Sequence, residues 1–189
     1  MQSTDISPLS APGVVAPRAL HPAAGFSGRA TKPPRGLYLP HGAPSNVQFG
    51  GHVPTNGGRT GAQKAGLHYE SKVHDVLEAI YGPDYRRSPS MFYEDRRGLH
   101  RAIPDGILKV ASDLVVIEVK LRHTERAWWQ LVRLYMPLLR TLVVPGTRVF
   151  GVEICRSYDP DEPFPGPHAL ISSLHRLPVD RVGVLTWKV

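Results

Sequence analysis

The chain has 189 residues, of which 41% are hydrophobic, and a formal net charge of +7. This length is sufficient for one domain with a sizeable core. The sequence contains no run of eighteen apolar residues, so a membrane-spanning helix is not expected. The first twenty residues lack the basic and apolar regions of a secretory signal. The single cysteine, Cys155, excludes an internal disulfide and a cysteine-only metal cluster. We therefore expect a cytosol-like, reducing compartment, which for a viral protein is the host cytoplasm or the virion.

The N-terminal third has the composition of an irregular segment. Residues 1–65 contain six Lys or Arg residues and one Asp, and pieces such as TKPPRG and TNGGRTG are typical of loops. Such a segment cannot bury enough apolar surface to offset its ordering entropy. We predict a flexible, basic, Pro- and Gly-rich arm at 1–65, followed by one folded domain at 66–189. The arm suits a polyanion such as DNA, or a protein partner that orders it. A tail that serves solubility is the alternative.

The folded domain is predicted to combine helices and strands. The spacing of Val73, Val76, Leu77 and Ile80 predicts an amphipathic helix over 67–82, which Gly82 and Pro83 end. The apolar patterns that follow predict strands at 90–95, 101–109, 114–121, 147–155 and 181–189, a second helix at 124–142, a loop at 157–168 and a short helix at 169–177. The order α–β–β–β–α–β predicts an α/β domain with a mixed central sheet and flanking helices.

Three features of the later elements can be predicted individually. Thr124 is the expected N-cap of the second helix, and Pro137 is expected to end or kink that helix. At least one of Trp128 and Trp129 is expected in the core, with stacking on a nucleic-acid base as the alternative. Cys155 lies on an apolar strand and is expected to be an inert core residue.

The stretch IPDGILKVASDLVVIEVKL places charged residues on two otherwise apolar strands. With the turn centred on Ala111–Ser112, Asp105 lies opposite Glu118, and Ile103 lies opposite Lys120. Since side chains two residues apart share a face of a strand, the three charged groups gather on one face. The other face of the second strand then points into the core with Val115, Ile117 and Val119.

Two opposed carboxylates repel each other, so this face needs a compensating cation. Mg²⁺ favours a few carboxylate oxygens, which predicts a metal site at the edge or surface of the sheet, with Lys120 beside it. Glu70, near Val73 on the buried face of the first helix, is the candidate third carboxylate, whereas Glu78 points further away. Simpler interpretations remain: PDG can be a turn, EVK can be a solvated face, and Glu70 can be a helix N-terminal acid.

Glu70 in the opening helix, Pro104-Asp105 on one strand and Glu118-Val119-Lys120 on the next, followed by a helix, resemble the PD-(D/E)xK nuclease superfamily over roughly residues 66–155. The resemblance implies a restriction-endonuclease-like fold with an αβββαβ core. It also implies that Mg²⁺ or Mn²⁺ is bound by the carboxylates of Glu70, Asp105 and Glu118 and by the carbonyl of Val119.

In the same resemblance, Lys120 would position or deprotonate the attacking water, and the metal would polarise the scissile phosphate. Gln130 is implied as a further site residue, because several branches of the superfamily have a glutamine on this helix. Tyr135 follows five residues later. We discount it here, because exonuclease-like branches space that pair by four.

We therefore expect a metal-dependent deoxyribonuclease, with cleavage inside a strand favoured over cleavage from an end. Phosphate contacts are expected from the basic residues around the second helix, with a solvated basic face as the alternative: Arg122, His123, Arg126 and Arg133. Self-association is a further expectation, and a membrane is not expected as a partner. The alternative function is a non-catalytic nucleic-acid-binding or assembly protein, such as a phage virion subunit, that has a nuclease-like fold and holds a partner through its N-terminal arm.

Overall fold

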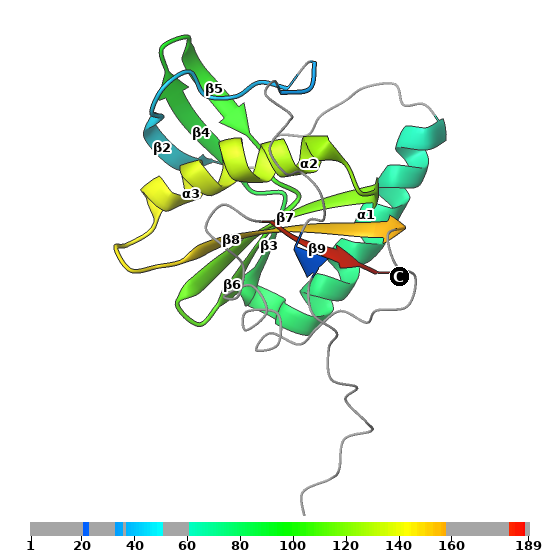
Figure 1. Cartoon of the computed structure of the whole chain (residues 1–189). Helices are drawn as coiled ribbons and strands as arrows, with labels where there is room; N and C mark the ends of the chain where they lie inside the picture. Colours follow the sequence, from blue (N-terminus) through cyan, green and yellow to red (C-terminus); the bar gives the residue numbers. More distant parts are fainter. Residues whose placement is uncertain (1–20, 23–32, 36, 51–60, 158–181, 188–189) are drawn as a thin grey trace, which may run out of the picture.

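The structure is a computed structural model, which describes residues 21–22, 33–35, 37–50, 61–157 and 182–187. Its main feature is a six-stranded sheet with the strand order β1–β9–β8–β7–β6–β3 (Figure 1). Strand β8 runs parallel to β7 and β9, and the other neighbouring pairs are antiparallel. The predicted mixed α/β fold is confirmed. The strands are β1 His21–Pro22, β3 Tyr85–Arg87, β6 Gly106–Val110, β7 Asp113–Arg122, β8 Val149–Ser157 and β9 Val182–Thr186.

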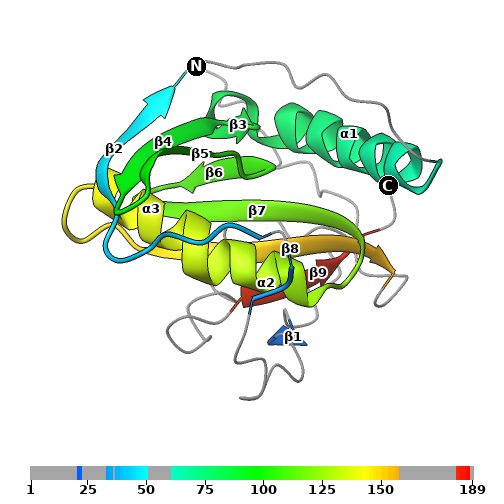
Figure 2. The same cartoon turned by 90° about the horizontal axis from the view of Figure 1, so that it is seen from above.

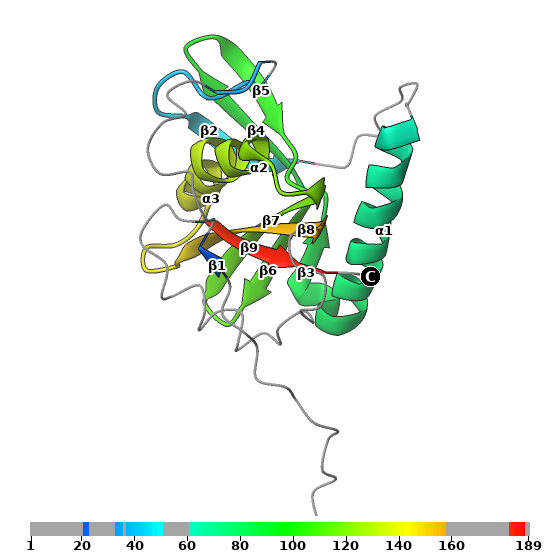
Figure 3. The same cartoon turned by 45° about the vertical axis from the view of Figure 1, so that its right-hand side comes forward.

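A second, three-stranded antiparallel sheet has the order β2–β4–β5 and stands apart from the main sheet (Figures 1 and 3). Its strands are β2 Ser45–Gly50, β4 Ser90–Asp95 and β5 Gly98–Ala102. The prediction of one strand at 101–109 is wrong, since β5 ends in this sheet and β6 begins in the other. Pro104 lies in the connection, where its missing N–H and fixed φ prevent the ladder from continuing.

The predicted irregular arm is also wrong in part. Residues 45–50 form β2, which pairs with β4, and Val47 packs against the core between the small sheet and the helices. Backbone pairing with a strand about 45 residues later supplies the order that the sequence of this segment does not predict. Within the predicted arm, the structure describes residues 21–22, 33–35, 37–50 and 61–65. The rest of the arm lies outside the described residues, as do the loop and short helix predicted between 158 and 177.

Helix α1, Gly61–Tyr81, lies along one face of the main sheet, and the later helices lie on the other face (Figures 2 and 3). Its buried side is formed by Tyr69, Val73, Leu77 and Tyr81, whereas Ile80 is 52% exposed. The prediction that Ile80 belongs to the buried stripe is therefore wrong, and Tyr81 takes that place. The short 3₁₀ turn η1, Gly82–Asp84, follows directly, as the predicted stop requires.

The second helical region comprises α2 Glu125–Gln130, a π-helical turn η2 Leu131–Tyr135 and α3 Met136–Leu142. Thr124 is the N-cap as predicted, since the N–H of Ala127 donates to Thr124 Oγ1 at 3.2 Å. Pro137 does not end the helix. In a regular helix its ring would clash with the carbonyl four residues earlier, and the widened turn η2 lies where that clash would fall.

Two apolar cores lie on the two faces of the main sheet. Val115, Ile117 and Val119 of β7 pack towards α1, and Val116 packs towards the other helices. Trp129 and Cys155 are buried, which confirms both predictions of core residues. No helix within the described ranges is long and apolar enough to cross a membrane. The middle of strand β7 is thus enclosed on both sides, and Glu118 there lies in a dry environment, whereas the strand ends in the exposed Arg122.

Candidate active site

Strands β6 and β7 pair in the predicted register, with Gly106 opposite Ile117 and Val110 opposite Asp113. Asp105 precedes β6 by one residue. Its Oδ2 accepts a hydrogen bond from the N–H of Val119 at 2.6 Å, so the carboxylate is held against β7. The predicted pairing of Ile103 with Lys120 does not form, because β6 begins only at Gly106.

Lys120 joins the two opposed carboxylates. Its Nζ donates to Glu118 Oε1 and lies 3.7 Å from Asp105 Oδ2. The Glu118 side chain is only 2% exposed. The predicted gathering of the three charged groups is therefore observed, with Glu118 buried and with the Asp105 and Lys120 side chains 18% and 28% exposed.

Burial dominates the electrostatics of this group. It raises the pKa of Glu118 to about 8, and the charge of Asp105 adds to that effect while Lys120 opposes it. Burial likewise raises the pKa of Asp105, against the charge of Lys120. Burial alone would lower the pKa of Lys120, but the two carboxylates outweigh it and raise that pKa. The cluster therefore has more negative charge than its surroundings stabilise, which favours uptake of a proton or a cation.

Helix α1 brings Glu70 close to the same cluster. The charge of Glu70 contributes to the raised pKa of both Asp105 and Glu118, and its side chain is 27% exposed. Glu78, its competitor on the same helix, is exposed. Glu70 is thus near enough for its charge to act on Asp105, Glu118 and Lys120, while the contact observed for its own carboxylate is with His74, so its membership of the site stays a prediction.

Two buried residues behind Glu70 were missed in the sequence. His74 Nε2 lies 3.4 Å from Glu70 Oε1, and His74 Nδ1 lies 2.5 Å from Tyr85 Oη. The only available signal was the spacing of four between Glu70 and His74, which puts both on one side of α1. Tyr85 belongs to β3, so its approach depends on tertiary structure alone.

Gln130 and Tyr135 form a hydrogen-bonded pair next to the cluster. Gln130 Nε2 donates to Tyr135 Oη at 3.1 Å, and the Tyr135 hydroxyl donates to the carbonyl of Ile103 at 3.1 Å. Burial raises the pKa of Tyr135 well above its ordinary value, and the charges of Glu118 and Asp105 add to this. The spacing of five was the reason to discount Tyr135, and it does not separate the two side chains, because the widened turn η2 brings residues five apart onto one side of the helix.

The predicted phosphate-binding residues divide into two kinds. Arg122, Arg126 and Arg133 are exposed, and the Arg133 guanidinium lies 6.0 Å from the centre of the Trp129 ring. His123 is held instead by a buried acid that the sequence did not single out, with Nδ1 2.7 Å from Glu153 Oε2. His123 is therefore held by a buried carboxylate, and the three arginines are exposed to solvent.

Glu153 lies on β8 directly beside Glu118. Its carboxylate also accepts a hydrogen bond from the N–H of Thr124 at 2.9 Å, which fixes the connection between β7 and α2. Burial raises the pKa of Glu153, and the charge of Lys120 is among the effects that oppose this. Lys120 thus experiences a third buried carboxylate from the neighbouring strand.

Three buried polar atoms in the described part of the chain lack a hydrogen-bond partner: His74 Nε2, Glu118 Oε2 and Gln130 Oε1. Such atoms are rare and call for an explanation, and all three belong to the residues assembled here. Among the described residues, no three or more His, Cys, Asp and Glu side chains are arranged closely enough to hold a metal ion. The Lys120 ammonium group lies between the two carboxylates instead. The free Glu118 oxygen and the excess of acids nevertheless fit the oxygen ligands that Mg²⁺ and Mn²⁺ prefer.

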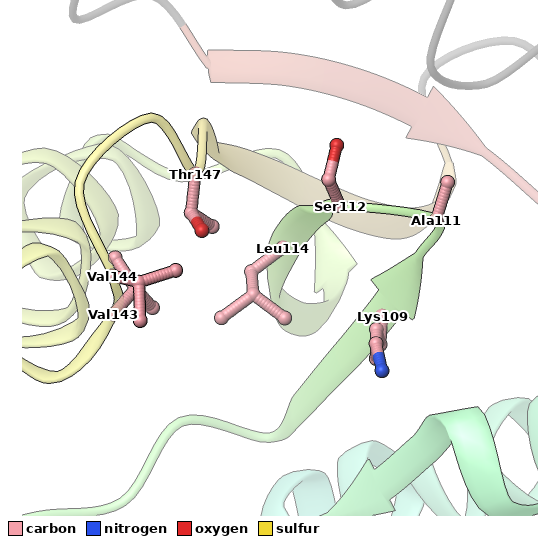
Figure 4. A pocket seen from close by; sticks show the side chains of 7 residues that line it. All are labelled: Lys109, Ala111, Ser112, Leu114, Val143, Val144 and Thr147. Carbon is pink, nitrogen blue, oxygen red and sulfur yellow. The ribbon is translucent and has the colours of Figure 1, made fainter.

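A pocket of about 390 Å³ lies elsewhere, at the turn that joins β6 to β7 (Figure 4). It contains none of the candidate residues, and its lining includes no carboxylate. We therefore assign it no chemistry. The residues that line it are Lys109, Ala111, Ser112, Leu114, Val143, Val144 and Thr147.

The chain was compared with known families, proteins and structures. No protein-family model, curated protein or solved structure matches it. The resemblance to the PD-(D/E)xK superfamily therefore remains an expectation from its own residues, and the function has to be argued from the site.

Proposed function

We propose that this protein is a divalent-metal-dependent nuclease that cleaves DNA within the strand. The observation that supports this best is the convergence of Asp105 and Lys120 on the buried Glu118, with one Glu118 oxygen left without a partner. Replacing a buried ion pair by apolar residues of similar volume often leaves a protein equally stable or more stable. A chain that keeps such an arrangement inside its sheet is a candidate for a functional site with perturbed pKa values.

Glu118, Asp105 and Glu70 would hold Mg²⁺ or Mn²⁺, and Val119 keeps Asp105 in place through its backbone N–H. When bound, the cation would supply Lewis acidity towards a phosphate and offset charge on the leaving oxygen. Lys120 keeps its proton at neutral pH because the carboxylates raise its pKa. Its role is therefore to orient a water or phosphate oxygen by hydrogen bonding, rather than to remove a proton.

The rest of the molecule supplies the features needed for a polyanionic substrate. The net charge of +7 favours association with phosphates. Arg122, Arg126 and Arg133 lie on or beside the helical region that starts where β7 ends. Arg122 follows Lys120 by two residues on β7, so the two side chains share a face of the strand. These arginines would hold the backbone of the DNA, which gives affinity without sequence preference.

The second candidate is a non-catalytic nucleic-acid-binding or assembly protein with a nuclease-like fold. Two observations favour it: Lys120 already lies between the two carboxylates and offsets part of their charge, and the described residues include no closely arranged metal-ligand group. In that case the ion pair is structural, and the N-terminal arm would hold the partner.

Cleavage of closed-circular, linear and branched DNA in Mg²⁺ or Mn²⁺ tests the proposal. Wild type is expected to nick the closed circle, which offers no end, and Asp105→Asn, Glu118→Gln and Lys120→Met are expected to lose this activity. Glu78→Gln is the matched control, because Glu78 is an exposed acid on the helix that also contains Glu70. Equal cleavage by all five proteins would refute the assignment. Binding of DNA without any cleavage by wild type would support the second candidate.

A further inference from the structure

The pair formed by His74 and Tyr85 is not accounted for by the residues that would hold the cation. His74 is fully buried. Its Nδ1 contacts Tyr85 Oη at 2.5 Å, and its Nε2, which has no hydrogen-bond partner among the described residues, lies 3.4 Å from Glu70 Oε1. A buried ring nitrogen without a partner is costly, so its position beside the third carboxylate needs a reason.

The Tyr85 hydroxyl can donate to His74 Nδ1 or accept from it, and the direction of this bond goes with the imidazole tautomer. Burial raises the pKa of Tyr85 far above its ordinary value of 10, and the nearby acids add to this, so the hydroxyl keeps its proton. When that hydroxyl donates to Nδ1, the imidazole carries its proton on Nε2. The Nε2–H group then faces the Glu70 carboxylate as a donor and is not available as a metal ligand.

Gly106 fixes the position of Tyr85. A Cβ at residue 106 would lie 2.4 Å from Tyr85 Oη and 2.7 Å from Cε2, so the tyrosine ring packs directly on the backbone that follows Asp105. Residues Gly106, Tyr85, His74 and Glu70 therefore form a continuous series of contacts from the start of β6 to α1. This series ties the carboxylate of the helix to the strand that presents Asp105.

We propose that His74 is a positioning residue that holds the Glu70 carboxylate towards the cation site, and that Tyr85 fixes the His74 tautomer. The inference rests on the proposed function to the extent that Glu70 must help to bind a cation. Ligating carboxylates are themselves hydrogen-bonded, and loss of such an outer partner typically lowers metal affinity 10–100-fold. The 3.4 Å separation between His74 Nε2 and Glu70 Oε1 would shorten to a hydrogen bond if the Glu70 carboxylate turned to hold a cation.

Direct Mn²⁺ binding, measured by calorimetry and by the electron paramagnetic resonance signal of free Mn²⁺, tests this role. His74→Leu fills the space without a donor and is expected to raise the Mn²⁺ dissociation constant about 10–100-fold, with the maximal cleavage rate at saturating Mn²⁺ little changed. His74→Gln supplies an N–H near the position of Nε2 and is expected to restore binding to within about threefold, on the same principle. Tyr85→Phe, which frees the tautomer, is expected to lie between the two.

The outcomes separate the inference from the nuclease proposal. A folded His74→Leu or Tyr85→Phe protein with unchanged Mn²⁺ affinity would overturn the positioning role, and Tyr85→Phe decides the matter if the leucine variant does not fold. Equal loss of binding in His74→Gln and His74→Leu would also overturn it, since that result marks His74 as a direct ligand. Wild type that binds Mn²⁺ without cleaving DNA would refute only the nuclease. If wild type binds Mn²⁺ no more tightly than Glu70→Gln does, both the nuclease proposal and the positioning role of His74 are refuted.

Discussion

Glu118→Gln is expected to make the cation-free protein more stable at alkaline pH while it abolishes cleavage. The pKa of Glu118 rises from its ordinary 4.5 to about 8 in the folded protein, first because of burial and then because of the charge of Asp105. Between these two values the folded state holds a proton that the unfolded chain has released, so stability is lost as the pH rises through this window. A difference of about 3.5 between the two pKa values corresponds to a loss on the order of 5 kcal/mol. Glutamine cannot ionise, so the variant lacks this loss.

Thermal unfolding of both proteins in chelator between pH 5 and pH 8 measures the effect. One kcal/mol corresponds to about 2–4 °C for a domain of this size, so the Tm of wild type should fall on the order of 10 °C more than that of the variant. Mn²⁺ at pH 8 should recover stability in wild type and not in Glu118→Gln, because ligand binding stabilises only the form that binds it. The exposed Glu78→Gln should follow wild type. Parallel profiles for wild type and Glu118→Gln would refute the idea that a buried carboxylate at this position resists ionisation.

Two further predictions concern the surface and the contact behind the site. Replacing both Arg122 and Arg126 by Ala should reduce the slope of log affinity for DNA against log salt concentration by about 2, since each phosphate contact contributes about 0.9. Fluorescence anisotropy in chelator measures this slope. An unchanged slope would mean that neither arginine contacts the DNA. Gly106→Ala should lower the free energy of unfolding by about 1–3 kcal/mol, because its Cβ would lie 2.4 Å from Tyr85 Oη. Gly66→Ala on α1, whose Cβ meets nothing within 4 Å, should not destabilise, and equal denaturation curves for the two alanine variants would contradict the contact.

The hairpin of β6 and β7 could be predicted because its determinants are local. The turn Ala111–Ser112 and the alternation of side chains fix the register, and the observed pair of Gly106 with Ile117 follows from it. The division between β5 and β6 could not be predicted, since the partner of β5 is β4 in another sheet. Pro104 was the available signal, and it was interpreted as part of a strand.

The depth of the site was misjudged for a related reason. The run Leu114–Ile117 is almost continuously apolar, as is typical of a strand that is buried on both faces. The alternation of Val115, Ile117 and Val119 was interpreted as a strand with one buried face, so the opposite face was expected to be exposed to solvent. Helices on both sides of β7 instead exclude water from Glu118, and this burial produces the raised pKa.

The widened turn η2 leaves no distinct pattern in the sequence, because one extra residue in a single turn hardly alters the helical period. Its consequence is nevertheless testable: Gln130 and Tyr135 should act as one unit despite their spacing of five. Gln130→Ala and Tyr135→Phe should each cost about 1–3 kcal/mol, because each removes the bond between the two side chains and Tyr135→Phe also removes the donor to the Ile103 carbonyl.

The double variant should therefore cost less than the sum of the single variants, with a coupling of about 0.5–3 kcal/mol in denaturant unfolding. Thr141→Val on α3 is the control, because the hydrogen bond observed for the Thr141 hydroxyl goes to the carbonyl of Leu138. This variant should combine additively with Gln130→Ala. Additive behaviour of Gln130→Ala with Tyr135→Phe would mean that the pair is a chance contact. Coupling would mean that the π turn is what places the tyrosine hydroxyl between the helix and the Ile103 carbonyl, two residues before Asp105.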